Sequence, residues 1–170
     1  MVAVAMNEPD VPILLTRPTD ASRALERRLR EDGIALPIEI SPILRIEFCD
    51  VAPPLDMAGA IFTSKNGVVA VPRENMPAWC VGWATAEIAE AKGWRTISAD
   101  GEAQSLLRRI LADAPEGKLV HFRGEHMRVD VAAQLREKGL DAVDIVAYRQ
   151  EAAPLEKEAR ALLEREKPVI

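Results

Sequence analysis

The feature of this 170-residue chain that most restricts its fold is the alternation of short apolar runs with segments of helical periodicity. Each apolar run has the length of a β-strand, and Gly33, Gly93 and Gly139 stand where helical segments end. Strands that alternate with helices are typical of a parallel sheet, because a crossover must precede each new parallel strand. The sequence therefore predicts an α/β fold built on parallel sheets.

The apolar runs and the capping signals place the expected elements. Strands are expected at residues 11–15, 35–40, 43–48, 60–62, 79–82, 94–97, 119–122 and 140–148. Helices are expected from Thr19 or Asp20 to Gly33, from the turn at residues 63–67, from a cap near Thr85 to Gly93, and at residues 102–111, 127–138 and 155–166. The apolar run at residues 1–6 lacks a positive start, so we expect a loose tail.

Composition indicates a compact soluble protein. Apolar residues make up 48% and charged residues 29% of the chain, which disfavours disordered, collagen-like and coiled-coil classes. The net charge of −5 argues against a nucleic-acid binder, although local arginines can still hold a small anion. Cys49 and Cys80 form no CxxC motif and no disulfide framework. With no apolar run long enough to span a membrane, we expect a cytoplasmic protein.

Two stretches of the chain resemble each other: ILLTRPTDASRALERRLREDGIALPIEI and LVHFRGEHMRVDVAAQLREKGLDAVDIVAY. Both contain an apolar strand, an arginine-bearing turn, a helix that ends at a glycine, and another extended run. The matching glycines, Gly33 and Gly139, are too far apart for a solenoid repeat. Either two related α/β units or two generic strand–helix units with a common capping pattern explain the similarity.

Four turns that follow predicted strands carry the polar residues of a candidate ligand site. They are Thr16-Arg17-Pro18, residues 63–67, residues 82–85 and Arg123-Gly124. In an open α/β sheet, ligands bind outside the carboxyl ends of the strands, where helix starts favour carboxylate or phosphate groups. Each turn alone is explained by helix capping, but the four together predict a site for an anion.

Other kinds of site find less support. Neither GxxxxGK[ST] nor GxGxxG occurs, and no GxSxG elbow points to a serine nucleophile. His121 and His126 lack the HExxH spacing, so we interpret them as a packed strand residue and a surface residue. Tyr148, the one tyrosine, ends an apolar run. Its phenol either donates a proton to a leaving oxygen or marks the boundary of the core.

Six sequence blocks, taken in order, resemble uroporphyrinogen-III synthases. They are LLTRP, IFTSKNGV, VGWATAEIAEAKGW, LVHFRGEHMR, the LREKG helix end and VAYRQE. The resemblance implies two α/β lobes with parallel three-layer sheets, joined by a two-stranded connector. Lobe one would comprise residues 1–36 and 154–170, the connector residues 37–53 and 143–153, and lobe two residues 54–142.

The implied first lobe is discontinuous and, with the sequence ending at Ile170, incomplete. An incomplete lobe leaves sheet edges unpaired and apolar faces uncovered. We therefore expect lobe one to be poorly stable and the chain to be weakly active or inactive. Robust formation of the type III isomer by the purified chain would contradict this expectation.

The activity implied by the resemblance is cyclisation of hydroxymethylbilane to uroporphyrinogen III, with inversion of the fourth ring and loss of water. Neither a cofactor nor a metal is implied. Tyr148 resembles a tyrosine that assists departure of the hydroxyl. The residues that resemble those of the substrate cleft are Arg17, Thr63, Ser64, Gly82, Thr85, Arg123 and Gly124. The family is thought to hold the substrate's carboxylates largely through backbone amides.

The implied partner is the linear tetrapyrrole, taken by a monomer from hydroxymethylbilane synthase, with no nucleic acid and no membrane involved. Two other interpretations stay open. One is a non-catalytic α/β module that binds a tetrapyrrole or another anion. The other is a flavodoxin-like protein that binds FMN or a nucleotide, which the missing phosphate motifs disfavour.

Overall fold

The computed structural model describes residues 11–99, 101–164 and 169–170. The chain forms two compact units, one that runs to Arg45 and resumes at Glu151, and one that comprises Ile46–Gln150. The loose tail expected at residues 1–6 lies outside the described residues. The limits of the two lobes and of the connector given above remain predictions.

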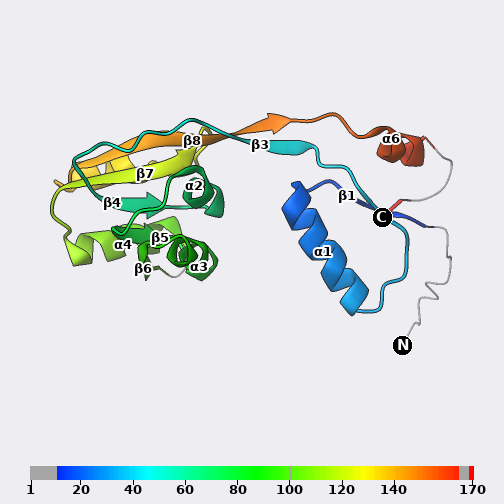
Figure 1. The fold of residues 1–170 in the computed structure, drawn as a ribbon, viewed down its shortest axis with the longest axis horizontal. Helices are drawn as coiled ribbons and strands as arrows, with labels where there is room; N and C mark the ends of the chain where they lie inside the picture. The colour runs from blue at the N-terminus through cyan, green and yellow to red at the C-terminus, as the bar shows by residue number, and fades with distance from the viewer. Residues whose placement is uncertain (1–10, 100, 165–168) are drawn as a thin grey trace. The chain divides into compact units, whose positions relative to one another are not determined.

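Strands and helices alternate along the chain, and their order can be followed from blue to red in Figure 1. The strands are β1 (Ile13–Leu15), β2 (Ile38–Ile40), β3 (Leu44–Phe48), β4 (Met57–Phe62), β5 (Pro77–Cys80), β6 (Arg95–Ser98), β7 (Lys118–Gly124) and β8 (Ala142–Ala152). The helices are α1 (Thr19–Glu31), α2 (Lys65–Ala70), α3 (Trp83–Ala91), α4 (Ala103–Asp113), α5 (Val131–Glu137) and α6 (Lys157–Leu163). Within the described ranges, no helix has the length and apolar character needed to cross a membrane.

The larger unit is built on a sheet with the strand order β3-β8-β7-β4-β5-β6. From β8 to β6 every neighbouring pair is parallel, which confirms the predicted α/β fold. After β4 the chain adds β5 and β6 on one side and then crosses back to place β7 on the other side of β4. The carboxyl ends of β4 and β7 therefore border the switch point, the position where open α/β sheets bind ligands.

Two hydrophobic cores lie on opposite faces of this sheet, because successive side chains of a strand point to opposite faces. Phe62 of β4 packs with residues of α2 and α3, whereas its neighbour Ile61 packs with residues of α4 and α5. Both side chains are fully buried. Strand β4 is thus anchored on both faces, which fixes the position of Thr63 and Ser64 directly after it.

The smaller unit pairs β1 with β2 in parallel, with α1 between them in sequence. Gly33 follows α1 with φ +82°, a left-handed conformation that suits glycine. On the other edge of β1, the Leu14 N–H donates to the Ile170 carbonyl at 2.8 Å, and the Ile170 N–H donates to the Pro12 carbonyl at 3.0 Å. The buried residues described in this unit are Pro12, Leu15, Ser22, Ser41, Ala153 and Ala159.

The two similar sequence stretches fold in the same way. One forms β1-α1-β2 and the other forms β7-α5-β8, and in each the two strands pair in parallel. Gly33 and Gly139 follow the two helices with φ +82° and +89°. The matching helix ends in the sequence therefore correspond to matching helix ends in the structure.

Helix α5 begins later than predicted. It starts at Val131 rather than at residue 127, because the Asp130 side chain accepts a hydrogen bond from the Ala133 N–H at 2.8 Å and caps the helix there. The prediction of a helix start at residue 127 is therefore wrong. Residues 125–130 form a loop between β7 and α5 instead.

Helix α3 begins earlier than the predicted cap near Thr85. Its N-cap is Gly82, whose carbonyl accepts a hydrogen bond from the Thr85 N–H at 3.1 Å. Thr85 is consequently a buried residue of the first helical turn rather than a cap. The predicted helix at residues 155–166 corresponds to α6, and the last two residues of that prediction lie outside the described residues.

Candidate functional site

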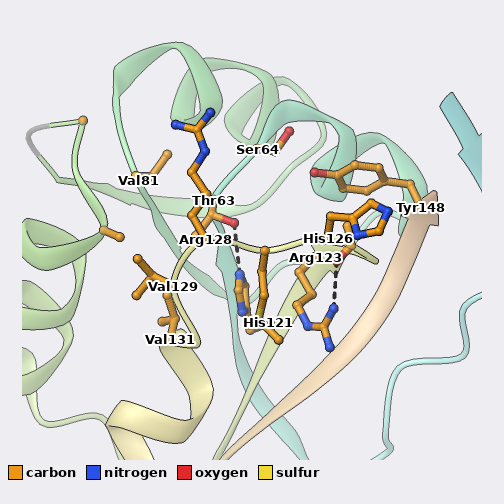
Figure 2. Close-up of a pocket in the computed structure, with 14 residues that line it drawn as sticks. Thr63, Ser64, Val81, His121, Arg123, His126, Arg128, Val129, Val131 and Tyr148 are labelled. Carbon is orange, nitrogen blue, oxygen red and sulfur yellow. Dashed lines mark hydrogen bonds between the residues drawn. The ribbon is translucent and has the colours of Figure 1, made fainter. Parts of the chain in front are cut away.

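A pocket of about 390 Å³ opens at the carboxyl edge of the larger sheet (Figure 2). Its wall is formed by residues at the ends of β4 and β5, in the second half of β7, within β8, at the starts of α4 and α5, and in the loop at 125–130. The lining residues are Thr63, Ser64, Val81, Gly101, Ala103, His121, Arg123, Gly124, His126, Met127, Arg128, Val129, Val131 and Tyr148. Hydroxyl, imidazole and guanidinium groups thus alternate with apolar side chains, which suits an anionic ligand with an apolar body.

Thr63 and Ser64 form the wall where β4 ends. Ser64 is the N-cap of α2, and its hydroxyl accepts a hydrogen bond from the Asn66 N–H at 3.2 Å. Helix α2 lies close to β7 because residue 67 is a glycine: a Cβ there would come within 2.4 Å of the Phe122 carbonyl oxygen. Gly67 therefore lets the turn with both hydroxyls lie against the end of β7.

Tyr148 brings a phenol to the pocket from β8. It is paired in register with Gly124 of β7, and its ring occupies the space beside that glycine, where a Cβ would come within 2.8 Å of a ring carbon. The tyrosine is only 8% exposed. Figure 2 shows its hydroxyl pointing into the pocket. The phenol is therefore held in place by packing while its polar end stays accessible.

A buried histidine lines the pocket from β7. His121 is 1% exposed. Its Nε2 lies 3.0 Å from Thr63 Oγ1, and its Nδ1 lies 2.9 Å from Asp144 Oδ1; Figure 2 shows the first of these hydrogen bonds. The interpretation of His121 as a packed strand residue agrees with its burial but did not include this chain of hydroxyl, imidazole and carboxylate.

Asp144, on β8, is the acid of this chain. Burial by itself raises the pKa of Asp144, but the hydrogen bond from His121 and the positive charges of Arg123 and Arg136 act against it, and the net effect holds the pKa below the ordinary value of 3.8. The Arg123 Nε lies 3.3 Å from Asp144 Oδ1. Asp144 is therefore ionised at neutral pH and can only accept hydrogen bonds.

Arg123 lines the pocket, but much of its guanidinium is used by the protein itself. Its Nη1 donates to the carbonyls of Gly124 at 2.8 Å and Glu125 at 3.1 Å, and its side chain is 15% exposed. Arg123 therefore holds the start of the loop at 125–130. His126 and Arg128 of that loop are exposed basic residues of the pocket lining.

Most of the predicted site residues meet at this pocket. Those that line it are Thr63, Ser64, Arg123, Gly124 and Tyr148. Gly82 and Thr85 are not among its described lining residues: Gly82 follows the lining residue Val81, and Thr85 is buried in α3. Arg17 belongs to the smaller unit, where it is exposed and its carbonyl accepts a hydrogen bond from the Ser22 hydroxyl. The roles assigned to all these residues stay predictions.

Sequence reasoning missed His121, His126 and Arg128 as pocket residues. The last two were hidden by the helix expected from residue 127, whereas the structure has a loop there. The signal that could have revealed this loop is Asp130, a strong capping residue placed directly before the apolar run of α5. No local signal pairs His121 with Thr63 and Asp144, since they lie on three different strand segments.

Cys80 is a buried residue of β5. Burial raises the pKa of the Cys80 thiol to about 12, so this residue carries no reactive thiolate at neutral pH. Over the described residues, no group of three or more histidine, cysteine, aspartate or glutamate side chains is placed to hold a metal ion.

Comparisons with solved structures agree with this fold. The chain is similar to the uroporphyrinogen-III synthetase from Helicobacter pylori 26695, with a TM-score of 0.58 and 17% identity over 77% of this chain and 64% of that chain. It is also similar to a mutant uroporphyrinogen III synthase from the extremely thermophilic bacterium Thermus thermophilus, with a TM-score of 0.55 and 16% identity over 85% of this chain and 64% of that chain. The chain thus spans about 64% of the length of both proteins.

The sequence itself was compared with family models and with curated proteins. The search of curated proteins gives no match. The family model described as "Uroporphyrinogen-III synthase HemD" matches residues 23–170, which is most of the chain. Since the match covers the pocket, the whole larger unit and most of the smaller unit after residue 22, the chain belongs to the uroporphyrinogen-III synthase family.

Proposed function

We propose that this chain binds hydroxymethylbilane in the pocket of the larger unit and converts it to uroporphyrinogen III, with inversion of the fourth ring and release of one water. The observation that carries the proposal is the position of Tyr148. In a chain of this family, the one phenol reaches a pocket at the switch point of the sheet, among hydroxyl and basic side chains. The proposal is supported by the match between these groups and the needs of the substrate.

The substrate is a chain of four pyrrole rings that carry acetate and propionate groups. Its carboxylates suit the basic side chains of His126 and Arg128, and the N–H groups at the start of α4. Its rings suit the apolar lining residues Val81, Val129 and Val131. Binding at both kinds of group would hold the flexible substrate in a bent conformation, which brings its two ends together.

In the proposed reaction, Tyr148 is the general acid. The C–O bond of the hydroxymethyl group breaks as the phenol gives its proton to the leaving oxygen, so that water departs and a cationic methylene remains on the first ring. The fourth ring attacks this carbon through its substituted position, giving a spiro intermediate that rearranges and closes the macrocycle. The proton lost in the final step returns the phenol to its starting state, so the net change is loss of one water.

The test is the isomer composition of the product. Purified protein is incubated with hydroxymethylbilane, and the products are oxidised to porphyrins and separated into types I and III. The proposal expects type III product above the spontaneous type I background. Strong type III formation would at the same time contradict the expectation, drawn from the family resemblance, that the chain is weakly active or inactive. Retention of the linear substrate without any change in the isomer ratio would contradict catalysis and favour the non-catalytic binding module.

Replacing Tyr148 by phenylalanine tests the role of the phenol. Tyr148→Phe keeps the ring beside Gly124 and removes only the hydroxyl, so the rate of type III formation should fall by roughly 10²- to 10⁴-fold, the range of general-acid catalysis. Phe48→Leu, which changes an exposed aromatic residue of β3 outside the pocket, is the matched control and should keep the wild-type rate. An unchanged rate in Tyr148→Phe would show that the proton comes from another donor.

A further inference from the structure

We propose that His121 and Asp144 form a positioning pair that fixes the hydroxyl of Thr63 as a hydrogen-bond acceptor toward the pocket, where it receives an N–H group of the ligand. On the proposed substrate this donor is a pyrrole N–H. The identity of the ligand rests on the proposed function. The orientation of the hydroxyl is a property of the free protein and can be tested without any ligand.

Asp144 determines which nitrogen of the His121 ring carries a hydrogen. Asp144 is ionised and offers only acceptor oxygens, and its Oδ1 lies 2.9 Å from His121 Nδ1. This contact requires a hydrogen on Nδ1. The proposed pair uses the neutral imidazole, in which one nitrogen carries the hydrogen and the other is an acceptor, so Nε2 is left without a hydrogen.

The His121 ring in turn determines where the hydroxyl hydrogen of Thr63 points. Its Oγ1 lies 3.0 Å from His121 Nε2, and a nitrogen without a hydrogen must accept in this contact. The single hydroxyl hydrogen of Thr63 is therefore directed at His121, away from the pocket. Because Thr63 also lines the pocket, the remaining lone pairs of its oxygen are available there. A ligand group that binds at this oxygen must bring its own hydrogen.

The surroundings keep this arrangement in place. His121 is 1% exposed, so water does not compete for either ring nitrogen. Arg123 lies beside Asp144 Oδ1 at 3.3 Å, and its positive charge together with that of Arg136 favours the ionised carboxylate. The order hydroxyl, imidazole and carboxylate also occurs in nucleophilic triads. The proposed reaction forms no bond to the protein, however, so here the pair orients a hydroxyl instead of activating it.

This orientation distinguishes the pyrrole N–H groups of the proposed substrate from its carboxylates. Its carboxylates carry no hydrogen at neutral pH and cannot bind at an acceptor oxygen, whereas each pyrrole ring has one N–H to donate. We therefore expect ring nitrogens to face Thr63, at the ends of β4 and β7, and carboxylates to face the basic residues of the loop at 125–130. The positioning pair would in this way determine which side of the substrate enters the pocket.

The orientation is tested by ¹⁵N NMR of the full chain with labelled histidine, at neutral pH and without ligand. His121 should show the tautomer with the hydrogen on Nδ1 and a bare Nε2. The exposed His126, the other histidine of the chain, provides the reference for a solvated ring. In Asp144→Asn this preference should be lost, whereas Asp141→Asn, the same change at an exposed residue just before β8, should leave it intact. A hydrogen on Nε2 of His121 in the wild-type protein would overturn the proposal.

The ligand group is tested with two ring diacids of equal shape, a pyrrole and a furan that each carry one acetate and one propionate. Binding is followed by NMR titration, which detects weak complexes. The wild-type protein should prefer the pyrrole by roughly threefold to tenfold, the range of one hydrogen bond. Thr63→Val, which keeps the side-chain shape, should abolish this preference, whereas Thr96→Val, the same change in β6 outside the pocket, should retain it.

Equal affinity of the wild-type protein for the two rings would overturn the assignment of a ring N–H to Thr63. If neither the pyrrole nor the furan binds, that assignment and the proposed function are both overturned. Because the tautomer of His121 is measured without ligand, it decides the positioning pair in both cases and keeps the two failures distinguishable.

Discussion

At the scale of single residues, the shape of the pocket depends on two positions that lack a side chain. Gly67 lets α2 lie against the backbone of β7, and Gly124 leaves the space that the ring of Tyr148 occupies. The first approach positions the hydroxyls of Thr63 and Ser64, and the second positions the phenol. The polar groups of the pocket are therefore placed by backbone packing as well as by their own hydrogen bonds.

We predict that Gly67→Ala destabilises the protein. The new Cβ would meet the Phe122 carbonyl oxygen, a backbone atom that cannot move away cheaply, so α2 must shift from β7 at a cost of about 1–3 kcal/mol. A gain of roughly 1 kcal/mol in helix propensity offsets part of this cost, so the net loss is up to about 2 kcal/mol. Urea denaturation should show a lower midpoint for Gly67→Ala, whereas Val69→Ala, at an exposed position of the same helix, should change it little. An unchanged midpoint would mean that α2 can move freely.

We also predict that Asp144 makes the stability of the fold sensitive to acid. Its pKa lies below the ordinary value of 3.8 in the folded chain, so the folded state favours the ionised form more than the unfolded chain does. The contribution is complete above pH 3.8 and is lost as the pH falls through the lowered folded pKa. Asp144→Asn should therefore be less stable than wild type at neutral pH, and the difference should shrink below pH 3.8. A difference that stays constant with pH would contradict this account.

At the scale of elements, α2 is too short to form by itself and depends on its ends. A six-residue helix lies far below the length at which isolated helices are stable. Ser64 caps its start, and the Lys92 Nζ donates to the carbonyls of Val68 and Val69 near its end, at 3.0 and 2.9 Å. Helix α2, and with it the Thr63-Ser64 turn, is thus held by α3 and by the sheet.

The start of helix α5 determines where the pocket loop ends, and we predict that the cap at Asp130 stabilises this start. Replacing Asp130 by alanine removes the acceptor of the Ala133 N–H and should lower the free energy of unfolding by about 1 kcal/mol. Asp130→Ser should retain most of the stability, since serine also caps helices. Thermal unfolding of the two variants gives the comparison. Equal losses in both would indicate that the cap is not what defines the start of α5.

At the scale of the whole molecule, the strand–helix order could be predicted because its signals are local. Apolar runs mark strands such as β4 and β7, and glycines such as Gly33 and Gly139 mark helix ends. The pocket residues at strand ends followed from the same order and from the family resemblance. Because ligands of α/β sheets bind at these ends, Thr63 and Ser64 could be named without a structure. Tyr148 was named from the family resemblance, and the prediction that its strand ends at residue 148 is wrong, because β8 continues to Ala152.

The contacts between distant strands could not be predicted in this way. His121 meets Thr63 and Asp144 only because β7 lies between β4 and β8 in a particular register. Register depends on the packing of both faces of the sheet, and a single sequence does not display it. The start of α5 was missed for a different reason: one side-chain cap at Asp130 outweighs the helical periodicity of the preceding residues.

The two units should also differ in stability. In the larger unit both faces of the sheet carry a buried core, whereas the buried residues described in the smaller unit are few and mostly small, with Leu15 as the one large apolar side chain among them. Opening a segment with little buried apolar area costs less free energy. The backbone N–H groups of β1 should therefore exchange with solvent much sooner than those of β4.

Hydrogen exchange followed by mass spectrometry measures this difference in the intact chain. Peptides from β4 and β7 should exchange at least about tenfold more slowly than peptides from β1 and β2, which corresponds to roughly 1.4 kcal/mol of additional opening free energy. A variant that weakens the larger core, such as Phe62→Ala at a fully buried position, should lower protection of β4 by about 3–5 kcal/mol. If the two units open independently, protection of β1 should stay the same in this variant. Equal protection of β1 and β4 in the wild-type chain would mean instead that the units unfold together.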